Sequence, residues 1–545
     1  MPRKKSAFQK FSDEFFDFIM REFPPTATWL GIHRYDTKLP DMSAARVEER
    51  NRQVEKFAAR LKRFNPRRLK GDGPVDYALT DGMLKCWIEG EKRFPDHKRM
   101  PGLYLNTGLY SLYVLIEREF APKAKRAKSV LARLKKFPRL LRQGMTNLER
   151  PPKEFTQAAI LAAKGAIGFL KGPLSQFIQP IRGKLGSDLA QARDKAVAAV
   201  ERYAKFLEED LLPRSRGKFA VGKQFFNLLL KYEHHVDVDA DELLRFGRKH
   251  LRSVKRELEQ TAKRIAPRRK WTTIVDELKQ EHPSNRELVN YYAKEMARAR
   301  DFVRKRRLAT FPPHERLKVI PTPDFARPLI PYAAYVSPAP FEPDKQGIFW
   351  VTTVPKGTPK KRAEEQLEGH SKYGIVVTAL HEAYPGHHFQ LSVAAHLPHR
   401  LRHLVHTSVF AEGWALYCEQ MMWEQGFYHD LRSRLLQLKD ALWRACRVVV
   451  DVNLHTGKMS FDEAVDFMVK EAKLERVNAE AEVRRYCQQP TQPMSYLLGK
   501  VQILELLKDY RKLKGKDFRL RKFHDQLLAH GTIPVKYVRE LMGVG

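Results

Sequence analysis

Apolar positions recur at helical spacing through most of the first 210 residues. Leucine, alanine, valine and phenylalanine return every three to four positions over 54–64, 158–169 and 187–212, which is the spacing of a helix that buries one face. Proline and glycine clusters at 23–25 and 71–74 interrupt this pattern and mark turns. The first part of the chain is therefore predicted to be a helical lobe.

The helical pattern breaks at 213–222, where turn residues and basic residues crowd together. We place a boundary here, between an N-terminal helical lobe of residues 1–215 and a catalytic lobe of residues 216–545. Early in the second lobe, Asp239 and Glu242 have the spacing of a capping box, in which each side chain accepts a backbone N–H of the other residue. This pair predicts the start of a long charged helix.

The spacing of apolar residues changes between 311 and 359. Proline recurs there, and short β-type runs occupy 317–320 and 348–354. We expect a small antiparallel sheet within about 311–359, directly before the segment with the candidate chemistry. The fold class is therefore mainly α, a large helical fold of two lobes with one small β-sheet.

The chain is strongly basic. Its 545 residues include 100 Lys and Arg against 64 Asp and Glu, a formal net charge of +36. The most basic stretch, 123–142, contains no acid and would attract RNA, anionic lipid or acidic peptides. Apolar residues recur at helical spacing through it, which favours a helix with a buried stripe and a solvated basic face. No known nucleic-acid-binding motif is visible, so a nucleic-acid partner is not favoured.

The sequence predicts neither membrane insertion nor disulfides. No window approaches the ~20 mostly apolar residues that span a bilayer, and the N-terminal segment MPRKKSAFQKFSDEFFDF lacks the apolar core of a secretory signal. The four cysteines, Cys86, Cys418, Cys446 and Cys487, lie far apart without C-x-x-C spacing. We expect a cytoplasmic protein.

The segment HEAYPGHH, which begins at His381, looks like a stretched H-E-x-x-H zinc motif. In the ordinary motif, two histidines four residues apart on one helix bind zinc, and the glutamate after the first histidine accepts a proton from water. Glu382 follows the first histidine here, but Pro385 occupies the position of the second. The motif therefore predicts a zinc site only if the helix is interrupted.

His387 and His388 are the two candidates for the second ligand. On an undistorted helix, His387 would point some 120° away from His381, and His388 would lie ~10 Å along the axis. Pro385 lacks an N–H and clashes with the carbonyl four residues earlier, while Gly386 tolerates non-helical dihedral angles. A bulge between the ligands would bring one of the two histidines to the metal, and the spacing leaves open which one.

A third ligand is offered by Glu412 in the segment FAEGWALYCE. A carboxylate from a following helix would complete a His-His-Glu set with one open position, which is the arrangement of catalytic rather than structural zinc. The small Ala415 would let the two helices pack closely. Glu419 is either a hydrogen-bond partner of a ligand histidine or a surface acid.

Five segments together resemble the domain-of-unknown-function 885 family (DUF885), placed among gluzincin-type zinc metallopeptidases. They are FPPTATWLGIHRYDTKLPDMS, GKFAVGKQFFNLLL, HEAYPGHHFQ, AEGWALYCE and RRYCQQPTQPMSYLLGK, and they span nearly the whole chain. The resemblance implies a mostly helical peptidase fold with a deep cleft and one Zn²⁺ bound by His381, His387 and Glu412. It implies Glu382 as the general base. It also favours His387 over His388, because the family pattern keeps the histidine after Pro-Gly.

The last of these segments contains further candidates. Thr491 departs from the family pattern, which usually has glycine there, so the loop conformation is open. Tyr496 is our candidate donor to the oxyanion of the reaction, or else it packs between helices with its hydroxyl on a backbone carbonyl. Arg485 would bind a substrate carboxylate or simply pair with Glu482 on its own helix face, and the pairing is slightly favoured.

The expected function is zinc-dependent hydrolysis of peptides narrow enough to enter an enclosed cleft. One alternative keeps the zinc but changes the substrate to another amide or an ester, since zinc-activated water does not itself specify a peptide bond. The other is a basic pseudoenzyme that binds nucleic acid or other anions. In that case the candidate ligands would be a buried polar cluster between helices, which is costly without a metal or partners.

Other histidines are weaker candidates. His399 and His403 have i, i+4 spacing that would bind metal adventitiously, but no glutamate follows either of them as a base. Their neighbours in this histidine-rich stretch are His396 and His406. His234 and His235 precede a predicted helix and are interpreted as part of its entry loop.

Overall fold

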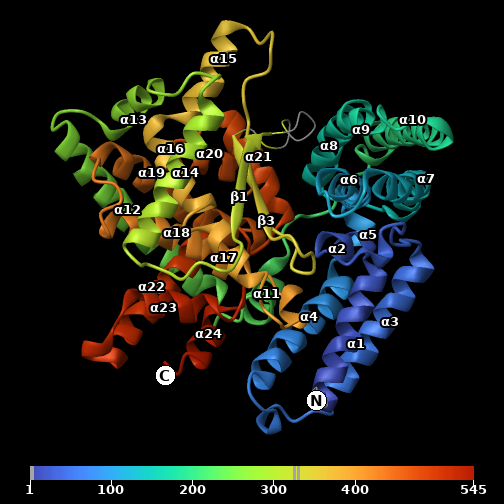
Figure 1. Ribbon diagram of the computed structural model, residues 1–545, viewed down its shortest axis with the longest axis horizontal. Coiled ribbons are helices and arrows are strands. Elements are labelled where there is room, and N and C mark those ends of the chain that lie inside the picture. Colours follow the sequence, from blue (N-terminus) through green and yellow to red (C-terminus); the bar gives the residue numbers. More distant parts are fainter. Residues whose placement is uncertain (1–4, 323–326, 328–329, 331, 545) are drawn as a thin grey trace.

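The computed structural model describes residues 5–322, 327, 330 and 332–544, and it is mainly helical with one small sheet (Figure 1). The first helices are α1 (Ala7–Glu22), α2 (Pro24–Trp29), α3 (Ala44–Leu61), α4 (Gly73–Arg93), α5 (Asp96–Arg99), α6 (Pro101–Glu117), α7 (Lys123–Asn147), α8 (Lys153–Lys171), α9 (Pro173–Ile178), α10 (Gly183–Lys205) and the π-helical turn η3 (Phe206–Leu211).

The remaining elements are α11 (Gly222–Tyr232), α12 (Ala240–Ile265), α13 (Trp271–Gln280), α14 (Leu288–Lys305), β1 (Arg316–Pro321), β2 (Ala333–Val336), β3 (Gln346–Val351), α15 (Lys360–Leu367), α16 (Lys372–Glu382), α17 (His387–Ala394), α18 (Ser408–Glu424), α19 (Leu431–His455), α20 (Phe461–Ala472), α21 (Arg476–Gln488), α22 (Ser495–Lys514), α23 (Leu520–Leu528) and α24 (Val535–Leu541). The predicted mainly α fold class is confirmed.

The helices α1–α10 lie on one side of the molecule and α12–α24 on the other (Figure 1). The three helices predicted at 54–64, 158–169 and 187–212 correspond to α3, α8 and α10 with η3. Phenylalanines of α1 and α3 form one N-terminal core, and α6, α7, α8 and α10 form a second. The proposed boundary between residues 215 and 216 and the deep cleft stay predictions.

The basic stretch at 123–142 forms most of α7. Its apolar stripe is buried as predicted, with Val130, Leu134 and Phe137 inaccessible to solvent. The prediction of a wholly solvated basic face is wrong for Arg133, which is also inaccessible and donates hydrogen bonds to the hydroxyl of Thr28 and to backbone carbonyls. Its guanidinium satisfies carbonyls where chain segments meet, so part of the basic character of α7 is structural.

The capping box of α12 is confirmed. The side chain of Asp239 accepts the N–H of Glu242 at 2.8 Å, and the side chain of Glu242 accepts the N–H of Asp239 at 2.9 Å. The helix then runs without interruption to Ile265 and packs along α19. The capping box therefore correctly predicts where this long charged helix begins.

The sheet is mixed, so the prediction of an antiparallel sheet is wrong for one of its two pairings. The strand order is β1-β3-β2, with β1 parallel to β3 and β2 antiparallel to β3. A connection as long as the one between β1 and β3 can cross over and return in the same direction, which the sequence pattern did not reveal. The short strand β2 was also missed.

The sheet lies between the two groups of helices. On β3, Trp350 packs into the core of the N-terminal helices, whereas Phe349 and Val351 pack into the core that contains α14, α16 and α18. This alternation follows from the two-residue period of a strand. The face of the sheet that carries Phe349 and Val351 therefore lies against the core that contains α16 and α18, the helices of the candidate site.

Two glycines bring α18 and α22 into backbone contact. A side chain on Gly413 would overlap the backbone of Gly499, and a side chain on Gly499 would overlap the carbonyl of Val409. Ala415, which is predicted to let the helix of Glu412 pack closely on the helix of His381, is fully buried, and α18 packs against α16.

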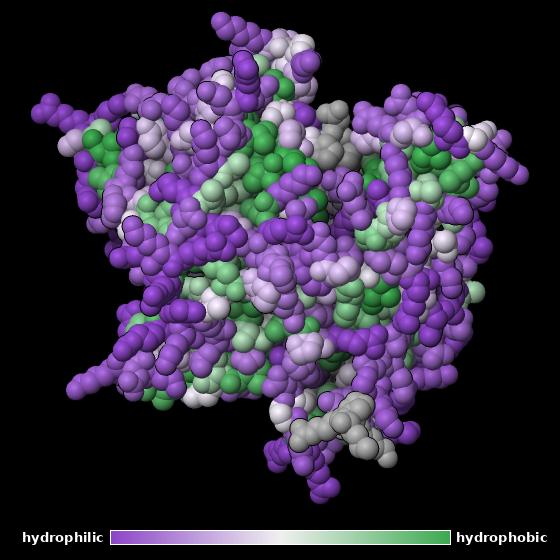
Figure 2. All heavy atoms as spheres, in the orientation of Figure 1, coloured by the Kyte–Doolittle hydropathy of each residue, from purple (hydrophilic) through white to green (hydrophobic). Residues whose placement is uncertain are grey.

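Within the described residues, no helix is both long enough and apolar enough to cross a membrane. Hydrophilic side chains cover most of the face shown in Figure 2, with apolar residues in separate patches between them.

We expect Gly413→Ala to lower the stability of the protein by about 1–3 kcal/mol, because the added methyl group forces α18 away from α22. The measurement is the midpoint of thermal unfolding of the full chain. Gly165→Ala on α8 is the matched control, since a side chain there meets no neighbouring atom within 4 Å and should stabilise the helix by about 0.5–1 kcal/mol. Equal midpoints for Gly413→Ala and wild type would contradict the assigned contact.

Candidate metal centre

The helix with the first candidate ligand ends where the motif predicts an interruption. The α16 helix stops at Glu382, the next four residues form a turn, and α17 begins at His387. A side chain on Gly386 would overlap the carbonyl oxygens of Leu380 and His381, so only glycine allows the turn to fold back this tightly. The predicted break in the helix is confirmed.

The turn is fixed to α18. The indole N–H of Trp414 donates a hydrogen bond to the carbonyl of Pro385 at 2.7 Å, and Trp414 is inaccessible to solvent. The N–H of Gly386 donates to the carbonyl of Leu380 at 3.0 Å. The backbone groups that the broken helix frees are therefore bonded within the turn or by α18.

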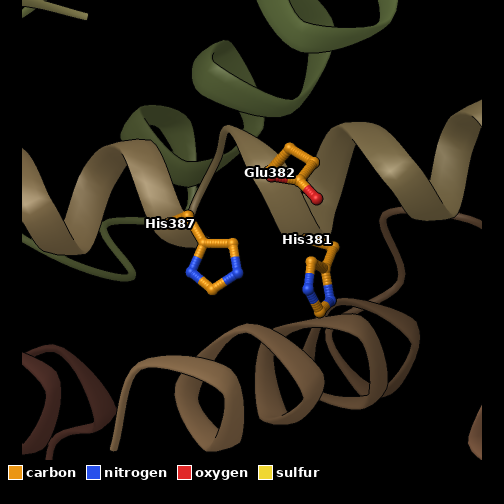
Figure 3. Close-up of side chains that lie close together, drawn as sticks. All are labelled: His381, Glu382 and His387. Atoms are coloured by element: carbon orange, nitrogen blue, oxygen red, sulfur yellow. The ribbon is translucent and has the colours of Figure 1, made fainter. Parts of the chain in front are cut away.

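The interruption brings His381, Glu382 and His387 together. One ligand atom from each of these residues lies within 4.8 Å of the others, and the three side chains converge from the end of one helix and the start of the next (Figure 3). Glu412 of α18 joins them, with its Oε2 3.2 Å from Nε2 of His387 and 3.6 Å from Nε2 of His381. All four residues named from the motifs thus meet at one place.

These groups fit a zinc ion. Tetrahedral zinc with bonds of 2.0–2.1 Å to nitrogen and oxygen separates neighbouring ligand atoms by about 3.3 Å, close to the separations of 3.2 and 3.6 Å found here. Oε2 of Glu412 is buried and has no hydrogen-bond partner among the described residues. A buried carboxylate oxygen without a partner is costly, and a cation between it and the two imidazoles would compensate.

The charges of the site are strongly coupled. Burial would lower the pKa of His381, but the carboxylates of Glu412 and Glu419 outweigh burial and raise the pKa to about 10. Burial would raise the pKa of Glu412, but the two histidines hold it well below the usual range. Without a metal, an imidazolium therefore supplies the positive charge that these carboxylates require.

Glu419 is a partner of His381 and not a surface acid. Its Oε1 lies 2.7 Å from Nδ1 of His381, and its side chain is 1% exposed. The amide of Gln437 donates to its other oxygen at 3.3 Å. This carboxylate orients the ring and leaves Nε2 of His381 facing Glu412, as in carboxylate–histidine–zinc arrangements.

His387 and His388 point into different environments. His388 is inaccessible, its Nε2 lies 2.7 Å from Oε1 of Glu315, and its Nδ1 lies 3.0 Å from the hydroxyl of Tyr335 on β2. Glu315 also accepts a hydrogen bond from Tyr384. His387 is the histidine that shares Glu412 with His381, which agrees with the choice made from the family pattern.

Tyr496, at the start of α22, faces the candidate ligands. Its ring is nearly parallel to that of His381, with the centroids 6.5 Å apart, and the Arg447 guanidinium lies 4.7 Å from the Tyr496 ring centre. Burial, with a contribution from Glu412, raises its pKa. Its hydroxyl makes no hydrogen bond to a described residue, so the expected alternative of a bond to a backbone carbonyl is not observed and the proton is available for donation.

Arg485 is engaged with its own segment. It donates to Glu482 at 3.1 Å, to Gln492 at 2.8 Å and to Gln489 at 3.2 Å. The predicted pairing with Glu482 is therefore present. Its side chain is still 32% exposed, and a role in substrate binding stays a prediction.

The loop around Thr491 adopts the conformation that glycine favours. Thr491 has a φ of 68°, in the left-handed region, although the chain has threonine where the family usually has glycine. Its N–H donates to Asp451 at 3.2 Å, and its hydroxyl lies 2.9 Å from Nε2 of His234. These bonds hold the loop in place despite the unfavourable φ.

The remaining histidines do not form a second metal site among the described residues. His399 lies 3.9 Å from Asp72, whereas Nε2 of His403 bonds to the carbonyl of Leu397 at 3.0 Å, so the two face different partners. His396 bonds to a backbone carbonyl, and His406 is exposed beside Glu412 and His387. His235 follows α11 in the loop before α12, as predicted, and bonds to the hydroxyl of Tyr537.

Sequence reasoning missed three residues that support the site. Glu315 lies far from the motifs in the chain, so no spacing connects it with His388. Trp414 was visible within the EGWA segment, but its bond to Pro385 depends on how α18 crosses the turn. Arg447 lies under Tyr496 and donates to Tyr486 and Glu482. The signal available in the sequence was that Arg447 stands within a mostly apolar stretch of α19.

The family described as bacterial protein of unknown function (DUF885) matches residues 24–542. A structure from Shewanella oneidensis, described as a putative lipoprotein of unknown function, is similar with a TM-score of 0.81 and 25% identity, over 99% of this chain and 100% of that chain. Another, described as a putative lipoprotein from Colwellia psychrerythraea, has a TM-score of 0.83 and 19% identity over 99% of both chains, and shows the fold alone. No curated protein matches the chain.

We expect Glu482→Gln to make the protein less stable at pH 7 and to reduce its loss of stability in acid. Burial would raise the pKa of Glu482, but Arg447 and Arg485 lower it to about 2, against an ordinary value of 4.5. A carboxylate with a lowered pKa stabilises the fold above its unfolded pKa, and this contribution, about 3 kcal/mol, is lost as the pH falls toward 2.

The measurement is the midpoint of thermal unfolding at several pH values from 7 to 3. The difference between wild type and Glu482→Gln should be largest at pH 7 and narrow below about pH 4.5. Glu480→Gln, two residues earlier on α21, is the control and should change little at any pH. A difference that stays constant or widens in acid would exclude the assigned charge network.

Proposed function

The chain belongs to the DUF885 family of bacterial proteins of unknown function, and we propose that it is a zinc-dependent hydrolase of the gluzincin type that cleaves peptide bonds. The main support is Oε2 of Glu412, which is buried without a hydrogen bond between two imidazole nitrogens at 3.2 and 3.6 Å. His381, His387 and Glu412 would hold the zinc ion. When bound, the ion supplies Lewis-acid polarisation and lowers the pKa of water at the site.

Glu382 is placed to act as the general base. Its carboxylate lies beside both histidines, and it accepts no hydrogen bond from a described residue, so its oxygens are available to an incoming water. It would take the proton from the attacking water and pass it to the leaving amine. The end of α16 fixes its backbone next to His381, which keeps the base and the ligand in a constant relation.

Tyr496 would donate its hydroxyl hydrogen bond to the oxyanion that forms on the scissile carbonyl. Its proton is retained at neutral pH because its pKa is raised, and the guanidinium of Arg447 below the ring helps to fix its position. A peptide substrate and a cytoplasmic location are predictions from the sequence. A panel of other amides and esters beside peptides would identify a different substrate class.

We expect about one zinc per chain in the wild-type protein, together with hydrolysis of members of a mixed peptide library. Glu412→Ala should lose both, because two histidines alone leave the ion without its third protein ligand. Metal content by mass spectrometry and hydrolysis are measured on the same untagged samples. Wild-type protein that takes up no zinc when zinc is supplied would refute the proposed centre.

Two neighbouring variants compare the two candidate histidines. His387→Ala should lower the zinc content, and it should also lower the stability of the metal-free protein, because Glu412 loses a close partner. His388→Ala should keep most of the zinc but lower the midpoint of thermal unfolding, because the buried Glu315 loses one hydrogen-bond partner while keeping Arg300 and Tyr384, a loss of about 1–3 kcal/mol. The reverse ranking of zinc content would assign the second ligand to His388.

We expect Glu382→Gln to retain zinc and lose hydrolysis by about 100-fold or more, since a neutral amide cannot act as a base. Metal content and kcat are measured in parallel, and the unfolding midpoint should match that of the wild type. Full activity in this variant would remove Glu382 from the mechanism. Loss of zinc in this variant would instead give Glu382 a place in the ligand set.

A further inference from the structure

Six buried polar residues form a connected belt between the helices that carry the candidate centre. They come from segments far apart in the chain: Gln390 on α17, Thr532 before α24, Thr407 at the start of α18, His234 after α11, Thr491 before α22 and Asp451 on α19. None of the six is more than 4% exposed. We refer to them as the polar belt, and no step of the proposed mechanism involves them.

Thr532 joins the helix of one candidate ligand to the helix of another. Its hydroxyl accepts a hydrogen bond from the side-chain amide of Gln390 at 2.9 Å, and its carbonyl accepts the N–H of Thr407 at 3.1 Å. Gln390 lies three residues after His387 on α17, and Thr407 lies five residues before Glu412 at the start of α18. Thr532 therefore connects the two helices whose ligand atoms are 3.2 Å apart.

His234 continues the polar belt from α18 to the segment before α22. Its Nδ1 lies 3.4 Å from the hydroxyl of Thr407, and its Nε2 lies 2.9 Å from the hydroxyl of Thr491. The Thr491 hydroxyl donates its one proton to the carbonyl of Pro490, so Nε2 of His234 must be the donor to Thr491 and Nδ1 accepts from Thr407. This pattern requires a neutral ring, and burial lowers the pKa of His234 to about 3.

Asp451 closes the polar belt on the segment that leads to Tyr496. Its two side-chain oxygens accept the N–H of Thr491 at 3.2 Å and the N–H of Met494 at 3.1 Å. Met494 immediately precedes α22, and Tyr496 is the second residue of that helix. The segment with the left-handed φ of 68° at Thr491 is thus held by His234 on one side and by Asp451 on the other.

Hydrogen bonds give the polar belt a directional role that apolar packing would not supply. A hydrogen bond restricts both the separation and the direction of its two groups, and a bonded buried network gives a core one arrangement. Of the buried side-chain atoms of the belt, only Oε1 of Gln390 has no hydrogen bond to a described residue. The bonds lie within five residues of His387, Glu412 and Tyr496, where they fix the relative positions of the three helices.

We propose that the polar belt positions the groups of the candidate centre. Thr532 sets the helix of His387 against the helix of Glu412 for zinc binding. His234 sets the helix of Glu412 against the segment that leads to Tyr496. Both are positioning residues, because they act through other residues. This inference rests on the proposed function, since it assigns a task toward the same ligands and the same oxyanion donor.

Zinc affinity tests the first link. Thr532→Val keeps the shape of threonine and the carbonyl that bonds to Thr407 but removes the hydroxyl that binds Gln390. We expect the zinc dissociation constant of the full chain, measured by competition with a chromogenic chelator, to rise by about tenfold or more, as for other residues that orient metal ligands. Thr532→Ser keeps the hydroxyl and should bind zinc like the wild type. A role in folding alone would lower the unfolding midpoint and leave the zinc constant unchanged.

A double-mutant cycle tests the second link. Thr407→Val removes the hydroxyl that donates to His234 and keeps the N–H that bonds to Thr532. We expect kcat of the zinc-loaded chain on library peptides to fall by about tenfold with little change in KM, because a misplaced oxyanion donor affects the transition state. In the Tyr496→Phe background the same substitution should cost less than about twofold, since its effect passes through the Tyr496 hydroxyl. Thr407→Ser is the matched control.

The outcomes separate the polar belt from the catalytic proposal. Equal zinc constants for Thr532→Val and wild type would overturn the first link, and a full tenfold loss in the Tyr496→Phe background would overturn the second. Wild-type protein that binds zinc but hydrolyses no peptide would refute the peptidase and the second link, whereas the zinc constants would still decide the first. Wild-type protein that binds no zinc would refute the belt and the proposed function together.

Discussion

The tight turn at 383–386 is the constraint on which the candidate centre depends. A regular helix would direct His381 and His387 to different sides, so the two imidazoles meet only because α16 stops at Glu382 and α17 begins at once. Such a break exposes backbone donors and acceptors that must be bonded again. The N–H groups of Gly386 and Phe389 bond back to the end of α16 and the start of the turn, and Trp414 covers the carbonyl of Pro385.

The same helix that stabilises the turn also completes the ligand set. Trp414 reaches the turn, Glu412 lies between the two imidazoles, and Glu419 orients His381 from the far side. All three belong to α18, so their relative positions are fixed by helical geometry. The position of α18 is fixed in turn by its backbone contact with α22 at Gly413, and α22 presents Tyr496 at its first turn. One helix crossing therefore sets the ligands and the candidate oxyanion donor together.

How far the sequence predicted the structure depended on whether the relevant contact was local. The helices, the capping box at Asp239 and the break at Pro385 follow from neighbours within a few residues, and all are present. The residues named from the two motifs, His381, Glu382, His387 and Glu412, lie close together, as a shared metal site requires. The parallel pairing of β1 with β3, the bond of His388 to Glu315 and the burial of Arg133 depend on segments far apart in the chain. No spacing or composition in one sequence encodes such partners.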